Sequence, residues 1–180
     1  MKRFIIFTLT WLSLSAYSQT DFIHYNSLVE VEGNDYVIAT HENWKKGDGI
    51  QNRSLLFIHT KTGETNIVAF SNEDQIKKVE QVKIDNLGIN LILVEVLSIG
   101  SDSSKGIDMK EQIIILSPDG KQKTQLADNN FSVRSWAINK KTGTITVVGY
   151  YDTNKNGLDA TDKSEIGIYD LKTLKLIKKI

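Results

Sequence analysis

Residues 150–162 carry the clearest chemical pattern in the sequence. Side-chain oxygens recur at every second residue, on Asp152, Asn154 and Asn156, and Gly157 follows where a chain that wraps an ion must turn sharply. Calcium takes about six to eight oxygen ligands and accepts such a mixture of carboxylate, amide and main-chain carbonyl groups. The spacing therefore predicts a calcium site with the ligands Asp152, Asn154, Asn156, the Leu158 carbonyl, Asp159 and Asp162.

This loop departs from the EF-hand pattern at its far end. An EF-hand loop that begins at Asp152 would have a bidentate glutamate at its twelfth position, which here is Lys163. Asp159 and Asp162 are close enough in the sequence to replace that ligand, with water completing the shell. Two neutral amides among the ligands predict weak affinity, on the order of millimolar. The alternative is a solvated loop without metal, held by Asn and Asp side chains that hydrogen-bond to the backbone.

Familiar catalytic motifs are absent from the sequence. The three histidines, His24, His41 and His59, lack a second histidine or a cysteine at metal-ligand spacing, and no serine lies in a GxSxG elbow. Glycine-rich phosphate-binding motifs are also missing. We therefore expect a protein that is not an enzyme. The alternative, a glycan-active enzyme or accessory domain, requires two carboxyl groups within about ten ångströms of each other, drawn from Asp48, Asp102, Asp108 and Asp152.

Three long polar connections are the second place where binding is expected, because loops on a rigid scaffold usually carry the functional residues. They cover residues 42–53, 100–111 and 152–164. Trp44 is assigned to the first of them, where an aromatic side chain could anchor a ligand. Trp136 lies within an apolar run and is expected in the core. The ligand-binding candidates are Trp44, Asp48, Asp102 and Asp108, and loops that are merely long and solvated are the alternative.

A repeated pattern of apolar runs shows which elements must hold these residues. One run recurs at residues 35–40, 89–94 and 144–149. Another recurs at residues 54–58, 112–116 and 165–169. The residues alternate or form short β-branched blocks without a helical period, and tight turns separate the runs. Such repetition predicts a single all-β domain over residues 19–180, made of antiparallel four-stranded meander units at about residues 22–71, 72–128 and 129–180.

One stretch of the third unit adds a more specific likeness. The Asp, Asn and Gly loop that starts at Asp152 is followed by a strand that ends in the turn Tyr169-Asp170-Leu171-Lys172-Thr173. Together with the four-strand repeat, it resembles blades of secreted bacterial β-propellers of the TolB-like or WD-repeat-like kind. The resemblance implies a propeller-like fold with about three blades. Closed propellers have about four to eight blades, so we expect an open arc or a ring completed by a homodimer. The alternatives are a β-sandwich and a piece of a longer protein.

The first eighteen residues have the features of a secretory signal peptide. Lys2 and Arg3 precede an apolar stretch over residues 4–14, and Ala16 and Ser18 supply the small residues that signal peptidase recognises. The stretch is too short for a membrane span, so a secreted or periplasmic protein is expected. Without Lys2 and Arg3 the chain has 20 basic and 22 acidic side chains, and this balance does not favour nucleic acid. The expected function is a non-catalytic binding module that uses the face of the long loops, with a protein or a glycan as partner and calcium as the candidate stabilising ion.

Overall fold

The computed structural model describes residues 21–47, 49–71, 74–100, 108–152 and 162–180. These residues form three separate sheets, and each sheet is an antiparallel meander of four consecutive strands. Blade 1 contains β1 (Asp21–Glu30), β2 (Tyr36–Lys45), β3 (Gly49–His59) and β4 (Thr65–Ala69). Blade 2 contains β5 (Asp74–Ile84), β6 (Ile89–Gly100), β7 (Asp108–Leu116) and β8 (Lys123–Gln125). Blade 3 contains β9 (Phe131–Asn139), β10 (Thr144–Tyr151), β11 (Lys163–Asp170) and β12 (Leu176–Lys179).

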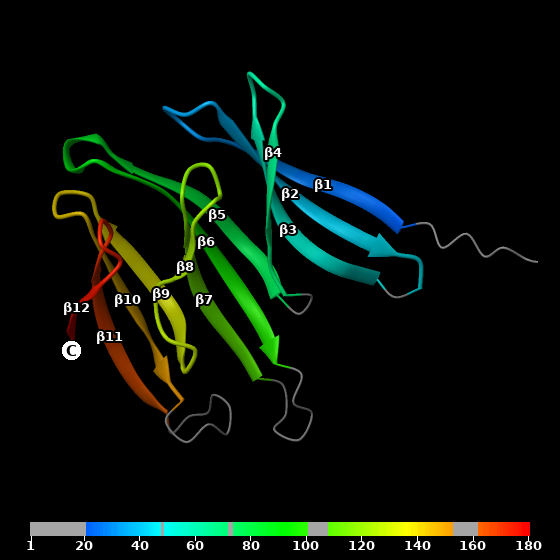
Figure 1. Ribbon diagram of the computed structural model, residues 1–180. Coiled ribbons are helices and arrows are strands. Elements are labelled where there is room, and N and C mark those ends of the chain that lie inside the picture. The colour runs from blue at the N-terminus through cyan, green and yellow to red at the C-terminus, as the bar shows by residue number, and fades with distance from the viewer. Residues whose placement is uncertain (1–20, 48, 72–73, 101–107, 153–161) are drawn as a thin grey trace, which may run out of the picture.

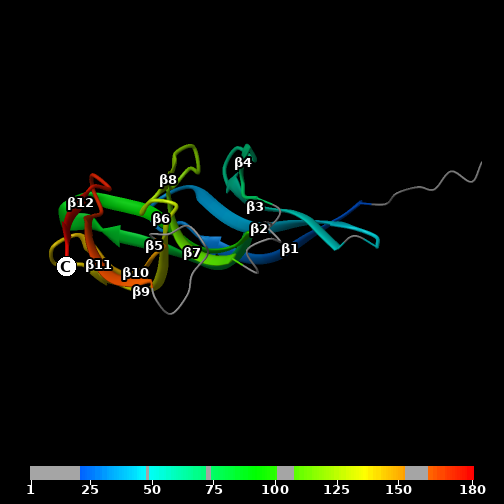
Figure 2. The same cartoon turned by 90° about the horizontal axis from the view of Figure 1, so that it is seen from below.

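The three blades confirm the expected fold class. Figure 1 shows blade 2, in green, between blade 1, in blue to cyan, and blade 3, in yellow to red. Figure 2 shows the same order of the sheets from below, with blades 1 and 3 at opposite ends. Three stacked sheets differ from the two facing sheets of a β-sandwich. The molecule is therefore an open, propeller-like arc of three blades.

Two apolar clusters join the blades, and blade 2 contributes to both. Ile92, Val94 and Val96 pack against blade 1, whereas Leu91 and Leu93 pack against blade 3. Successive side chains of a strand point to opposite faces, so β6 supplies one cluster with its even residues and the other with its odd residues. A strand that is buried on both faces has a continuous apolar run in its sequence, and residues 91–94 show this pattern.

The turn that joins the first two strands of each blade has a glycine in the left-handed region, as the sequence predicts. These glycines are Gly33, Gly88 and Gly143, with φ of 73°, 63° and 67°. In blade 2 the turn includes a single 3₁₀ turn at Asp85–Leu87. Among the residues of known placement, no helix is long and apolar enough to cross a membrane.

The prediction of a polar loop over residues 42–53 is wrong. β2 continues to Lys45 and β3 begins at Gly49, so most of these residues extend the hairpin. Glu42 pairs with Arg53 across the two strands, and a β-bulge follows between Asn43 and Trp44. A pair of opposite charges placed directly across two strands favours pairing, which explains why this polar segment remains a strand. The predicted connection at residues 100–111 is also too long, because β7 already begins at Asp108.

Candidate functional site

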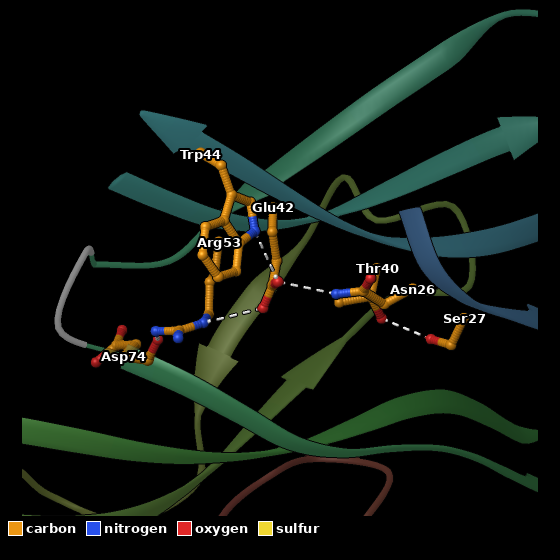
Figure 3. A network of polar contacts seen from close by, with 7 residues as sticks. All are labelled: Asn26, Ser27, Thr40, Glu42, Trp44, Arg53 and Asp74. Atoms are coloured by element: carbon orange, nitrogen blue, oxygen red, sulfur yellow. Dashed lines mark hydrogen bonds and ion pairs between the residues drawn. The ribbon is translucent and has the colours of Figure 1, made fainter. Parts of the chain in front are cut away.

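The strand extension places a compact polar cluster near one end of blade 1 (Figure 3). We name it the Glu42 cluster, and its members are Asn26, Glu42, Trp44 and Arg53. The Asn26 amide donates to Glu42 Oε2 over 2.9 Å, and the Trp44 indole N–H donates to the same oxygen over 3.3 Å. Arg53 Nε donates to the other oxygen, Oε1, over 3.3 Å. One carboxylate therefore holds three side chains that come from three neighbouring strands.

The charged pair at the centre of this cluster is well shielded from solvent. The side chains of Arg53 and Glu42 are 17% and 16% exposed. Arg53 also donates from Nη1 to the main-chain oxygen of Asp74 over 2.8 Å, which ties the cluster to the start of blade 2. Charge-assisted bonds of this type are stronger than neutral ones when water is largely excluded. We therefore expect the cluster to keep a single arrangement.

Aromatic side chains next to the Glu42 cluster remain accessible. Trp44 is 38% exposed, and its cross-strand neighbour Phe22 is 48% exposed. The His24 ring meets the Trp44 ring edge to face at a centroid distance of 5.8 Å. An exposed indole that is fixed by both its N–H and a second ring offers a rigid apolar surface beside polar groups. Ligand sites typically combine an aromatic surface with a small number of polar groups that point toward the same place.

Two of the predicted calcium ligands lie within the described residues, and both are buried. Asp152 follows β10 and is 2% exposed, and Asp162 precedes β11 and is 9% exposed. Asp152 Oδ1 is buried and accepts no hydrogen bond from the described residues, so this oxygen has the chemistry of a cation ligand. Asp152 Oδ2, however, lies 3.6 Å from the ammonium of Lys110 on β7. The other predicted ligands lie outside the described residues: Asn154, Asn156, Leu158 and Asp159.

The ligand-binding candidates are placed less uniformly. Trp44 lies in β2, and Asp108 is the first residue of β7, where it pairs with Gly100. Asp48 and Asp102 lie outside the described residues. Sequence reasoning missed Asn26, Glu42 and Arg53 because it read residues 42–53 as a loop. The signal was the spacing of Glu42 and Trp44 by two residues, which places both side chains on one face of a strand.

A second polar feature is an open groove of about 430 Å³ between blades 2 and 3, and Glu80, Glu95 and Glu111 line it. Each carboxylate already has a partner. Lys78 pairs with Glu80, the Trp136 indole donates to Glu95 over 3.1 Å, and Lys77 pairs with Glu111. The hydrogen bond to Glu111 raises the pKa of Lys77. All three carboxylates that line the groove are therefore already paired with a cation or an N–H donor of the described residues.

Ser54 and His41 are close enough to resemble a nucleophile and its general base. His41 Nδ1 lies 2.7 Å from Ser54 Oγ. Ser54 is only 4% exposed, so a substrate could not reach its hydroxyl group. No carboxylate contacts His41 within the described part of the chain. The bond therefore satisfies a buried hydroxyl group and does not form a catalytic triad.

Comparison with known proteins finds likeness in structure alone. No protein-family model matches the chain, and no curated protein matches its sequence. The β-propeller domain of the Trilobed protease from Pyrococcus furiosus, described as having an open velcro topology, is similar with a TM-score of 0.46 and 11% identity. The match covers 88% of this chain and 43% of that one.

A second similar structure is the acylaminoacyl peptidase of Pyrococcus horikoshii. Its TM-score is 0.45 at 8% identity, and the match covers 88% of this chain and 25% of that one. This chain therefore spans less than half of the length of either structure. Identities this low concern the fold alone, and they transfer no activity to this protein.

Proposed function

We propose that the protein is a secreted or periplasmic, non-catalytic binding module that holds a glycan against the Glu42 cluster. The observation that carries the proposal is the exposed Trp44 ring, which a nearly buried carboxylate and a second aromatic ring hold in place. Fixing a ring and its polar neighbours before binding lowers the entropy cost of capturing a ligand. The Glu42 cluster lies outside both apolar clusters, so its polar side chains are not needed to pack the core.

The chemistry of the cluster favours a sugar over other ligands. The flat face of an indole packs against the C–H face of a pyranose ring, as it does against other apolar surfaces. Beside it, Arg53 has N–H groups beyond those given to Glu42 and Asp74, and Asn26 has an amide oxygen that accepts hydrogen bonds. Donors and acceptors next to one another suit the neighbouring hydroxyl groups of a sugar. Carboxylate oxygens of Glu42 are already occupied, so its role is to position the other groups.

Substitution of Trp44 by alanine tests the proposed glycan site. We expect the wild-type protein to be retarded in native gels that contain soluble polysaccharides, such as laminarin, xylan or a β-glucan. Loss of the indole surface should weaken this binding at least tenfold, which corresponds to about 1.4 kcal/mol. The melting temperature should change little, because Trp44 is outside the apolar clusters.

Trp136→Phe is the matched control for this experiment. It removes an indole that contacts Glu95 in the groove between blades 2 and 3, away from the Glu42 cluster. Binding by this variant should equal that of the wild type. If no polysaccharide retards the wild-type protein, or if Trp44→Ala binds as well as the wild type, the glycan site is rejected. A protein ligand would then be the remaining class of partner.

We also propose that calcium stabilises the connection between β10 and β11. The buried Asp152 carboxylate, with one oxygen that lacks a partner among the described residues, supports this proposal. Lys110 acts in the opposite direction, because its ammonium already offsets part of the negative charge. A competing internal cation weakens metal binding, which agrees with the low affinity expected from the sequence.

Calcium should therefore raise the melting temperature, and replacement of Lys110 by glutamine should enlarge the shift. At a tenfold excess over the dissociation constant, binding stabilises by about 1.4 kcal/mol, or roughly 3 to 6 °C for a chain of this length. Differential scanning fluorimetry in calcium, magnesium and chelator measures the shift. Asp152→Asn should abolish it. Equal melting temperatures of the wild type in calcium and in chelator would reject the calcium site.

A further inference from the structure

The face of blade 1 that points away from blade 2 carries a row of apolar side chains, and no other blade among the described residues covers it. We call it the open face of blade 1. A row of cross-strand neighbours crosses all four strands of this face: Leu28, Ala39, Leu56 and Ile67. Leu28 is 72% exposed and Ile67 is 60% exposed. The adjacent residues Ile38 and Phe57 point the other way, into the cluster shared with blade 2. Contiguous apolar surface of this kind marks an interaction site.

Blade 3 has a corresponding face at the other end of the arc, the open face of blade 3 (Figures 1 and 2). Its central row contains Ser135, Val148 and Ile166, and the row beside it contains Ala137, Thr146 and Ile168. Ile180, which is 69% exposed, exchanges two main-chain hydrogen bonds with Ile166 and so extends the central row. The sheet therefore presents aliphatic side chains on a surface that neither of the other two described blades covers.

The two open faces are complementary in size when equivalent strands are aligned. The first strand of blade 1 presents the large side chains Tyr25 and Leu28, whereas the first strand of blade 3 presents the small side chains Ser135 and Ala137. The relation reverses at the second strands. There Ala39 of blade 1, only 2% exposed between the larger Leu28 and Leu56, forms a depression opposite Val148 of blade 3. Alternation of large and small side chains is what lets packed sheets interdigitate.

We propose that two copies of this chain associate head to tail, with the open face of blade 1 of each copy on the open face of blade 3 of the other. The structure assigns the two surfaces and their order. This joint continues the stacking already present between consecutive blades of one chain. Two three-bladed arcs then close a ring within the four to eight blades of closed propellers. A head-to-tail contact that closes leaves no open face behind.

Charge supports the same pairing. Between blades 1 and 2, Glu32 in the first turn of blade 1 lies 3.1 Å from Lys83, near the end of the first strand of blade 2. At the proposed joint, the first turn of blade 3 takes the place of the first turn of blade 1, and it carries the exposed Lys140 and Lys141. The end of β1 takes the place of the end of β5, and it carries the exposed Glu30. The turn is now positive and the strand end negative, so the two sides still attract each other.

The test is the molar mass of the protein, purified after expression of the full sequence, measured by light scattering during size-exclusion chromatography. We expect twice the chain mass that mass spectrometry gives for the same sample. Leu28→Lys should yield a single chain with an unchanged circular dichroism spectrum, because Leu28 packs against no other blade of its own chain. The matched control is Phe22→Lys, an exposed apolar residue of the same strand that lies on the other face, and it should remain a dimer.

Charge reversal identifies the partner face. Glu30→Lys should raise the dissociation constant of the dimer at least tenfold, and Lys140→Glu with Lys141→Glu in the same chain should restore it. A wild-type mass of one chain, or of three or more chains, would overturn the proposal. So would a Leu28→Lys variant that remains a dimer, or a Glu30→Lys defect that the two lysine reversals do not repair, because the contact would then lie on other surfaces.

Discussion

Replacement of Gly120 by alanine is expected to lower the free energy of unfolding by roughly 2 to 5 kcal/mol. Gly120 has a φ of 71°, and a side chain in this left-handed region costs about 1 to 2 kcal/mol. A Cβ atom there would also lie 2.6 Å from Cδ2 of Phe57, whose side chain is fully buried between blades 1 and 2. Overpacking of a core costs about 1 to 3 kcal/mol more. Urea denaturation followed by circular dichroism measures the change.

Gly63 provides the control that separates these two causes. It occupies the corresponding turn of blade 1 with a φ of 74°, but a Cβ atom there would meet nothing within 4 Å. Gly63→Ala should therefore cost only the backbone part, about 1 to 2 kcal/mol. In a Phe57→Leu background, the further cost of Gly120→Ala should fall to the Gly63 value. If Gly120→Ala and Gly63→Ala destabilise equally in the wild-type background, the contact with Phe57 is not as close as described.

The second large effect is expected for Leu93→Ala, which should destabilise the protein by about 3 to 4 kcal/mol. Leu93 is 0% exposed and belongs to the cluster between blades 2 and 3. Truncation removes buried methyl groups and leaves a cavity that rigid neighbouring sheets fill only in part. Stabilities of single domains are about 5 to 15 kcal/mol, so this change removes a large fraction of the total. Chemical denaturation at equilibrium gives the value.

Met109→Ala is the matched control, because Met109 lies on the same sheet but is 51% exposed. Its loss should change the free energy of unfolding by no more than about 0.5 kcal/mol. A difference between the two variants of less than about 1 kcal/mol would contradict the packing of blade 3 on blade 2. The comparison therefore tests the joint itself and not merely the hydrophobicity of the sheet.

The strands and turns could be predicted where the pattern of apolar side chains along the chain follows their burial. Residues 91–94 are apolar without interruption, and this run is the centre of the blade that packs against another blade on both faces. The ends of β2 and β3 were not predictable in the same way. There the strands continue through Glu42 and Arg53, and what stabilises them is a cross-strand charge pair that depends on register. Because most residues of this segment are polar, its composition predicts a loop.

The candidate site was predictable only in part for the same reason. Trp44 was found as an aromatic residue in polar surroundings, although it was assigned to the wrong element. Asn26 joins the cluster from a β-bulge, since β1 pairs with β2 on either side of it and shifts register there. The contact between Lys110 and Asp152 joins residues of two blades. It depends on how the sheets stack, which no local pattern of residues specifies.

The two-sided burial of β6 also bears on how this strand keeps its alignment. In most sheets a slip of one residue is prevented because it would turn apolar side chains toward water. Residues 91–94 are apolar on both sides, so a slip within this run would exchange one buried aliphatic residue for another. Alignment must then be specified by the polar residues that flank the run. Asn90 accepts from Gln81 over 2.8 Å, and Glu95 accepts from Trp136 over 3.1 Å, and a slip would break both bonds. These two hydrogen bonds therefore fix the register of β6, and with it the position of blade 2 relative to blade 3.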